Sequence, residues 1–181
     1  MEGLLSLCLI VKNEEKVLAR ALDGVRAYAD EIIIADTGST DGTKKIASEY
    51  TDKIYDFEWK DDFAAARNFA FSKATCEYIM WMDADDIVTP ENGVLLGKLR
   101  KRLETEKPDV VMCRYDVAFD TEGRATYSYI RERILRRENC PPWVGCVHEC
   151  IAPQGKIIFS HFTMRHGEVP GKVRGRRNLD I

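Results

Sequence analysis

The chain has 181 residues, of which 45% are hydrophobic and 31% are charged, and its formal net charge at pH 7 is -3. These values suit one globular domain with a sizeable core, and the acidic balance argues against nucleic acid as the main partner. No stretch approaches the ~20 apolar residues of a membrane-spanning helix. Lys12-Asn13-Glu14-Glu15 also follows the first apolar run where a signal peptide would need small residues. We therefore expect a cytoplasmic protein.

The first hundred residues alternate between short apolar runs and amphipathic segments. Residues 4–11 form a nearly continuous apolar run, which is typical of a parallel strand covered on both faces. Strands that alternate with helices of 10 to 15 residues predict a parallel α/β sheet. The expected strands are 4–11, 31–35, 53–59 and 77–82, and the expected helices are 14–28, 41–50, 63–73 and 90–105.

The pattern changes in the second half of the chain. Residues 109–115 and 125–137 are expected to be strands, and the second of these alternates as exposed strands do. Further short strands are expected over 143–151 and 156–162. We interpret this half as a mixed or antiparallel extension of the same sheet, which gives one domain over 1–170. Residues 171–181 are expected to begin a basic helix that is cut short.

Polar residues follow three of the expected parallel strands. They are Lys12-Asn13-Glu14, Asp36-Thr37-Gly38-Ser39 and Asp83-Ala84-Asp85-Asp86. In open parallel sheets, ligands bind beyond the carboxyl ends of the strands, so all three stretches should converge on one edge. This convergence predicts a ligand site.

The acidic stretch suggests what the site binds. Side chains alternate along a strand, so Asp83 and Asp85 can point the same way. Neighbouring carboxylates repel each other unless a cation lies between them, and Mg2+ or Mn2+ binds through one or two carboxylates together with substrate phosphates. The pattern therefore predicts a metal–diphosphate site. The alternative is a polar turn in which Asp86 caps the next helix.

Four motifs together resemble family 2 glycosyltransferases with the GT-A fold. They are Ile10-Val11-Lys12-Asn13-Glu14-Glu15, Asp36-Thr37-Gly38-Ser39-Thr40-Asp41-Gly42-Thr43, Ala65-Ala66-Arg67-Asn68 and Trp81-Met82-Asp83-Ala84-Asp85-Asp86, and they follow in the family's order and spacing. Two later stretches, Trp143 to Glu149 and Arg177-Asn178-Leu179, are similar to a branch whose catalytic domain is often followed by tetratricopeptide-like repeats. On this resemblance, a C-terminal repeat domain is missing from the chain.

The resemblance implies an α/β fold of the GT-A (Rossmann-like) type. Its central sheet should be mixed, with a parallel N-terminal half that has helices on both faces and a small antiparallel C-terminal extension. Residues 1–105 would form the nucleotide-sugar-binding half of the domain, and residues 106–170 would form the acceptor-side half.

The resemblance also implies roles for single residues on the donor side. Asp36 would accept a hydrogen bond from the nucleobase, whereas the alternative is an ordinary turn. Val11 and Glu14 would line the base and ribose pocket, although Glu14 could instead simply begin a helix. Arg67 would reach the base or the phosphates with support from Asn68, and the alternative for Arg67 is a solvated helix face.

The metal and the acceptor involve a second group of residues. Asp83 would lie near the ribose and the metal, and Asp85 would ligate Mn2+ or Mg2+. The Glu-Asp pair that commonly supplies the base in this family is absent, so Glu149 becomes the candidate base. His148 would orient Glu149 or ligate the metal, and His166 competes with it as the metal ligand. A hydrogen-bonded structural role stays open for both histidines.

These roles imply a metal-dependent, inverting glycosyltransferase that uses a nucleotide-sugar donor, UDP-linked in our interpretation. Its acceptor would be a glycan, a lipid-linked sugar or a peptide, and peripheral membrane association stays open. A sugar-phosphate nucleotidyltransferase is one alternative, but Lys12-Asn13-Glu14-Glu15 is not the Gly-rich basic loop of those enzymes. A non-catalytic nucleotide-sugar-binding module of a larger protein is the other.

Overall fold

The computed structural model describes residues 3–167. Its strands are β1 (Leu5–Val11), β2 (Glu31–Asp36), β3 (Ile54–Asp56), β4 (Tyr78–Trp81), β5 (Asp86–Ile87), β6 (Val110–Phe119), β7 (Ala125–Arg136) and β8 (Ile157–His166). Its helices are α1 (Leu18–Asp23), α2 (Thr43–Ala47), α3 (Phe63–Ser72) and α4 (Pro90–Glu106), with 3-10 turns η1 (Arg26–Tyr28) and η2 (Arg137–Asn139). The expected helix over 171–181 and the Arg177-Asn178-Leu179 motif lie outside the described residues.

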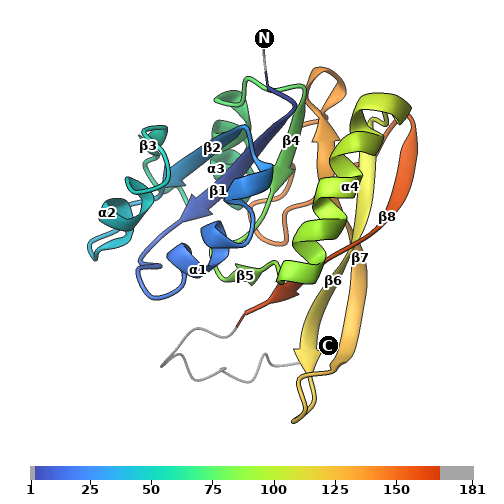
Figure 1. Ribbon diagram of the computed structural model, residues 1–181. Coiled ribbons are helices and arrows are strands. Elements are labelled where there is room, and N and C mark those ends of the chain that lie inside the picture. The colour runs from blue at the N-terminus through green and yellow to red at the C-terminus, as the bar shows by residue number, and fades with distance from the viewer. Residues whose placement is uncertain (1–2, 168–181) are drawn as a thin grey trace.

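The described strands form one sheet in the order β3-β2-β1-β4-β7-β6-β8-β5 (Figure 1). In the N-terminal half, β1 pairs in parallel with β2 and β4, and β2 pairs in parallel with β3. The second half begins where β7 pairs antiparallel with β4, and β6 is antiparallel to β7 but parallel to β8. The predicted mixed sheet with a parallel N-terminal half is confirmed.

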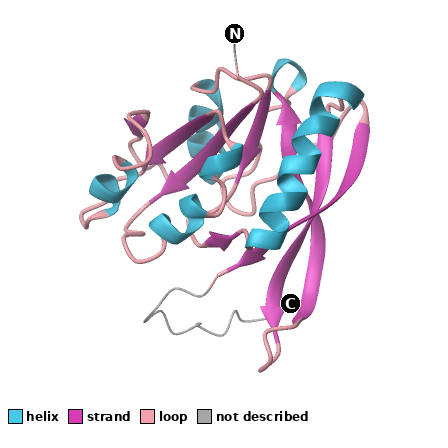
Figure 2. Cartoon of the chain, viewed as in Figure 1, coloured by secondary structure: helices cyan, strands magenta, loops and turns pink. Residues whose placement is uncertain are grey.

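Helices cover both faces of the parallel half, as predicted (Figure 2). On one face, Leu7 and Leu9 of β1 pack in a buried cluster with α1 and α4. On the other face, Cys8 of β1 and Ile33 of β2 pack with Ala70 of α3. Successive side chains of β1 therefore enter two different cores, which explains why its sequence is apolar throughout rather than alternating.

Several expected elements differ from the structure, among them one helix and one strand in the first and second halves of the chain. The helix expected over 14–28 is divided into α1 and η1 at Gly24, whose backbone lies so close to the residue after β5 that an added Cβ would be 2.7 Å from the carbonyl oxygen of Val88. The strand expected over 143–151 is wrong. That segment is a loop with one isolated bridge, between Val144 and Cys150, because Gly145 and His148 have left-handed backbone with φ of 97° and 56°.

Strand β6 continues to Phe119, beyond the expected end at residue 115, and in Figure 1 the β6–β7 hairpin extends beyond the body of the sheet. Its strands have 10 and 12 residues, and β8 continues to His166 instead of ending at residue 162.

Within residues 3–167, every helix is too short or too polar to span a lipid bilayer.

A buried carboxylate, Glu31, ties the amino ends of the parallel strands together. It accepts hydrogen bonds from Ser6 Oγ of β1 (2.6 Å), from the backbone N–H of Thr75 (2.8 Å) before β4, and from Lys53 before β3. Burial opposes ionisation of this group. The hydrogen bonds from Lys53, Ser6 and Thr75 outweigh burial and lower the pKa of Glu31 to about 2.

We expect Glu31→Gln to lower the free energy of unfolding by about 1–3 kcal/mol at pH 7, because a buried charged hydrogen-bond network is broken. The folded pKa of Glu31 lies below its ordinary 4.5, so the stabilisation is present above pH 4.5 and is lost as the pH falls toward 2. In urea unfolding, the difference in free energy of unfolding between Glu31→Gln and the wild-type protein should therefore become smaller from pH 7 to pH 3. The control Glu104→Gln, on the exposed side of α4, should have the same free energy of unfolding as the wild-type protein at both pH values.

Candidate active site

A cleft of about 520 Å³ lies at the carboxyl ends of β1, β2 and β4. It brings together most of the site residues predicted from the sequence, namely Val11, Glu14, Arg67, Asp83, Asp85, Glu149 and His166. All three polar stretches contribute to the cleft, as expected, and the second contributes Thr37. Three predicted site residues, Asp36, Asn68 and His148, do not line it.

The acidic stretch after β4 forms a tight turn. The Asp83 N–H donates to Asp86 Oδ2 (2.9 Å), and the Asp86 N–H donates to the Asp83 carbonyl (3.0 Å). Asp86 is fully buried and also accepts from Tyr115 (2.7 Å) and from Arg133 Nη1 (3.2 Å). Burial, opposed by the charge of Arg133, raises the pKa of Asp86 to about 6. The alternative in which Asp86 caps the next helix is wrong, because Thr89 is the N-cap of α4.

Asp85 and His166 are brought together by strand pairing rather than by sequence. The antiparallel pairing of β5 with β8 sets Asp86 opposite His166, and His166 Nδ1 lies 3.6 Å from Asp85 Oδ1. One ligand atom each of Asp85, Asp86 and His166 lies within 4.8 Å of the others. Carboxylate oxygens and an imidazole suit Mn2+, and the carboxylates also suit Mg2+, so the residues present fit a divalent cation.

Arg67 is a buried cation shared by two carboxylates. Its Nη2 donates to Asp83 Oδ1 and its Nε donates to Glu149 Oε1, each at 2.7 Å, and its guanidinium lies over the rings of Trp81 (4.4 Å) and Trp143 (5.2 Å). Burial opposes its charge, yet Asp83 and Glu149 raise the pKa of Arg67. The alternative of a solvated helix face is wrong, because Arg67 is only 5% exposed.

Asp83 itself is half-buried. Burial would raise its pKa, but the charges of Arg67 and Arg133 and the hydrogen bond from Arg67 lower it below the ordinary value. Asp83 therefore stays ionised at neutral pH with one oxygen directed at Arg67. Its predicted contacts with the ribose and the metal remain predictions.

Asn68 anchors the loop that carries Glu149. Its side chain donates to the Trp143 carbonyl (3.0 Å) and accepts from the Trp143 N–H (2.9 Å). The Phe63 N–H donates to the Cys146 carbonyl (3.0 Å) from the start of α3. His148 lies at the exposed turn of this loop. Asn68 thus supports the loop that carries Glu149, whereas the sequence suggested that it supports Arg67.

Asp36 ends β2 beside the cleft but is fully buried. Its Oδ1 accepts from the N–H groups of Gly38 (2.9 Å) and Ser39 (2.8 Å), as in an ordinary turn. Its Oδ2 has no hydrogen-bond partner among residues 3–167. A buried carboxylate oxygen without a donor calls for an explanation, and a ligand N–H is one.

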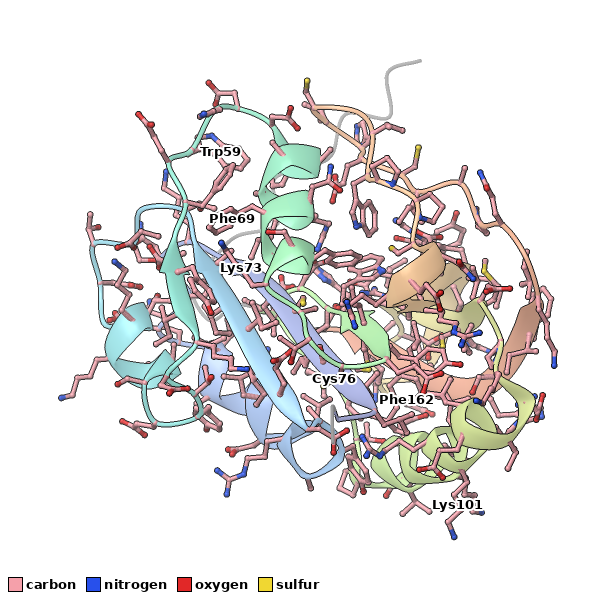
Figure 3. All side chains as sticks on the ribbon, turned by 90° about the horizontal axis from the view of Figure 1, so that it is seen from above. Trp59, Phe69, Lys73, Cys76, Lys101 and Phe162 are labelled. Carbon is pink, nitrogen blue, oxygen red and sulfur yellow. The ribbon has the colours of Figure 1, made fainter. Side chains whose placement is uncertain are left out.

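Several site residues were missed by sequence reasoning. Trp59 and Phe63 line the cleft as an edge-to-face pair with ring centroids 4.8 Å apart, and Figure 3 shows Trp59 on the loop that leads into α3. The sequence offered one signal for Trp59, an aromatic residue among charged ones at the end of an expected strand. Tyr115 and Arg133, which hold Asp86, come from strands far along the chain, and a fully buried Arg133 has no local signal.

The fold and the cleft define an α/β protein of the GT-A type with an acidic cleft at the carboxyl ends of its parallel strands. Residues 6–161 match the family described as glycosyl transferase family 2. The chain belongs to this family, as its motifs suggested, which argues against a nucleotidyltransferase.

Two relatives illustrate the similarity. The SPbeta prophage-derived glycosyltransferase SunS of Bacillus subtilis is 37% identical over 143 residues, which are 78% of this chain and 33% of that protein. A TPR repeat-containing protein of Synechococcus elongatus is 47% identical over 81 residues, which are 45% of this chain and 20% of that protein. The chain therefore spans a third or less of the length of these two relatives.

Solved structures share the fold. TarS of S. aureus (residues 1–349, in complex with UDP-GlcNAc) has a TM-score of 0.52 and 22% identity, covering 70% of this chain and 37% of that one. Glucosyl-3-phosphoglycerate synthase from Mycobacterium tuberculosis, in complex with Mn2+ and UDP-glucose, has a TM-score of 0.54 and 18% identity, covering 75% and 57%. At these identities the likeness establishes the GT-A fold.

We expect Asn68→Ala to loosen the loop at 143–150, because both of its hydrogen bonds to Trp143 are lost at once. Two such bonds correspond to about 1–3 kcal/mol, so amide hydrogen exchange in this loop should speed up by roughly 10- to 100-fold. Asn139→Ala, which removes one bond to Asp109 close by, is the matched control and should leave the exchange of the loop unchanged. Equal exchange in the two variants would contradict the anchoring role.

Proposed function

We propose that residues 1–170 form the catalytic domain of a glycosyltransferase that moves a sugar from a UDP-sugar to an acceptor, with Mn2+ or Mg2+ as cofactor. Residues 1–105 would bind the donor, and residues 106–170 would form the acceptor side. The observation that carries the proposal is that Asp83, Asp85, Glu149 and His166, from three separate parts of the chain, line one cleft.

The cleft is chemically divided, and the division suits a nucleotide sugar. Ile10 and Val11 from β1 and the aromatic pair Trp59 and Phe63 supply apolar surface for a nucleobase. Asp36 would contribute its partnerless Oδ2 to the base once nucleotide binding makes that atom accessible. Glu14 lines the same cleft and would lie toward the ribose.

The acidic part of the cleft would bind the diphosphate through a cation held by Asp85 and His166, with Asp83 nearby. Bound there, a divalent ion would neutralise the charge that develops on the departing nucleoside diphosphate. The role of Asp86 would be to hold this turn, since both of its oxygens already accept hydrogen bonds within the protein.

Glu149 is our candidate base for the acceptor hydroxyl. It lines the cleft, and the 2.7 Å bond from Arg67 holds its carboxylate in place. A base on the acceptor side makes the reaction a single displacement with inversion at the anomeric carbon. His148 directly precedes Glu149 in the chain, and its proposed part is to orient Glu149. Arg67 would act by positioning both carboxylates.

The acceptor would be a glycan, a lipid-linked sugar or a peptide. UDP-sugar as the donor is supported by the complexes of TarS with UDP-GlcNAc and of glucosyl-3-phosphoglycerate synthase with UDP-glucose. The TPR repeat-containing relative supports a C-terminal repeat domain in the longer protein. We also propose that the protein acts in the cytoplasm, as its sequence suggested.

A thermal-shift screen of UDP-sugars with and without Mn2+ tests this function. A donor at a hundredfold excess over its Kd stabilises the protein by ~2.7 kcal/mol, which raises Tm by roughly 5–11 °C for a chain of this size. We expect the shift to need Mn2+ and to disappear in Asp85→Asn, whose donor hydrolysis should fall at least ~10-fold. Asp52 is an exposed carboxylate that precedes β3, away from the cleft, so Asp52→Asn should behave as the wild-type protein does.

The same assays separate the alternatives. A Mn2+-dependent shift without any donor hydrolysis would favour a non-catalytic nucleotide-sugar-binding module. An equal shift in Asp85→Asn and in the unchanged protein would contradict the metal site, and no shift with any nucleotide sugar would contradict the proposed function as a whole.

A further inference from the structure

Tyr115, a buried residue of β6, has its hydroxyl between two side chains of the candidate site. The hydroxyl lies 2.7 Å from Asp86 Oδ1 and 3.1 Å from His166 Nδ1. The contact depends on three strands, because β8 pairs with β6 at Tyr115 and Met164 and with β5 at His166 and Asp86. Neither the motifs nor the proposed function gives Tyr115 a role.

The available donors and acceptors determine which group donates in each of these two hydrogen bonds. A tyrosine hydroxyl has one proton to donate. Asp86 Oδ2 already accepts from the Asp83 N–H and from the fully buried Arg133, and Asp86 Oδ1 accepts from the hydroxyl of Tyr115. The proton of Tyr115 therefore goes to Asp86.

The direction of that bond determines the tautomer of His166. With its proton directed at Asp86, the oxygen of Tyr115 can only accept from the imidazole, so Nδ1 must carry a hydrogen. The hydroxyl oxygen of Tyr115 lies 3.1 Å from Nδ1, closer than Asp85 Oδ1 at 3.6 Å, so Tyr115 is the partner within hydrogen-bond distance. The edge-to-face contact between the rings of Tyr115 and His166, with centroids 6.3 Å apart, also restricts the orientation of the imidazole.

We infer that Tyr115 is a positioning residue that holds His166 as the Nδ1–H tautomer, so that the Nε2 lone pair is the one available to a divalent cation. A hydrogen bond to the second nitrogen is the usual way in which proteins fix a ligating histidine. The metal part of this inference rests on the proposed function. The tautomer does not, since it follows from contacts within the metal-free chain.

The first test reads the tautomer directly. The chain has three histidines, and His148 and His161 are exposed, so His148→Gln and His161→Gln identify the signals of His166. Two-bond 1H–15N correlation spectra of the metal-free protein at pH 8 distinguish Nδ1–H from Nε2–H. We expect His166 as Nδ1–H in a single tautomer. An Nε2–H tautomer would overturn the inference, because it would mean that Tyr115 donates to His166.

The second test removes the hydroxyl group of Tyr115. Tyr115→Phe should give His166 a mixture of tautomers and weaken Mn2+ binding by about 10- to 100-fold, the usual effect of losing such a partner. Tyr129→Phe is the matched control. The ring centroid of Tyr129, on β7, lies 5.5 Å from that of Tyr115, but Tyr129 does not belong to the hydrogen-bonded group of Tyr115, Asp86 and His166. Mn2+ affinity is measured by calorimetry and by paramagnetic broadening of the His166 signals. Unchanged affinity in a folded Tyr115→Phe protein would overturn the inference.

The two kinds of failure are distinguishable. If the unchanged protein shows the Nδ1–H tautomer but no broadening by Mn2+, the proposed metal dependence is wrong and the metal part of the inference is overturned with it. If the unchanged protein binds Mn2+ while His166 is the Nε2–H tautomer, the proposed function survives and the role of Tyr115 is overturned. The tautomer readout needs no variant, so a Tyr115→Phe protein that fails to fold does not remove the test.

Discussion

Charge balance around one turn is the constraint on which the site depends. Asp83, Asp86 and Glu149 lie close together around the turn after β4, and the guanidinium groups of Arg67 and Arg133 are buried cations that pair with them. Buried charges must be paired to be tolerated. Arg67 pairs with Asp83 and Glu149, and Arg133 pairs with Asp86. These two arginines therefore allow several carboxylates to lie close together at the carboxyl ends of the parallel strands.

The parallel half of the fold and its ligand edge could be predicted because the signals are local. A run such as Leu5–Val11 is apolar on both faces, and the residues after it are polar, so both the strand and its end are visible in the sequence. Once three strands are parallel, their carboxyl ends must share an edge. The sequence alone was therefore sufficient to assign Asp83 and Asp85 to one cleft together with Val11 and Glu14.

The rest of the site depends on pairing between distant segments, which periodicity does not reveal. The two-residue strand β5 exists only because β8 lies beside it, and this pairing brings His166 to Asp85. Tyr115 and Arg133 reach Asp86 through β6 and β7, whose register is interrupted by bulges. The loop at 143–151 failed as a predicted strand for a different reason, since it is rich in apolar residues while two left-handed residues, Gly145 and His148, turn the backbone.

The chemistry of Arg67 explains why this cation is an arginine. It holds Asp83 through Nη2 and Glu149 through Nε, while its flat face lies on Trp81 and Trp143. A lysine would concentrate its charge at one nitrogen and has no flat face to stack, so it could not hold two carboxylates on different elements and remain buried between two indoles. Because α3 also supplies Asn68 to the same loop, one helix fixes the acidic turn after β4 and the loop that carries Glu149 relative to each other. The acidic turn and the loop that carries Glu149 are therefore connected through a single helix rather than placed independently.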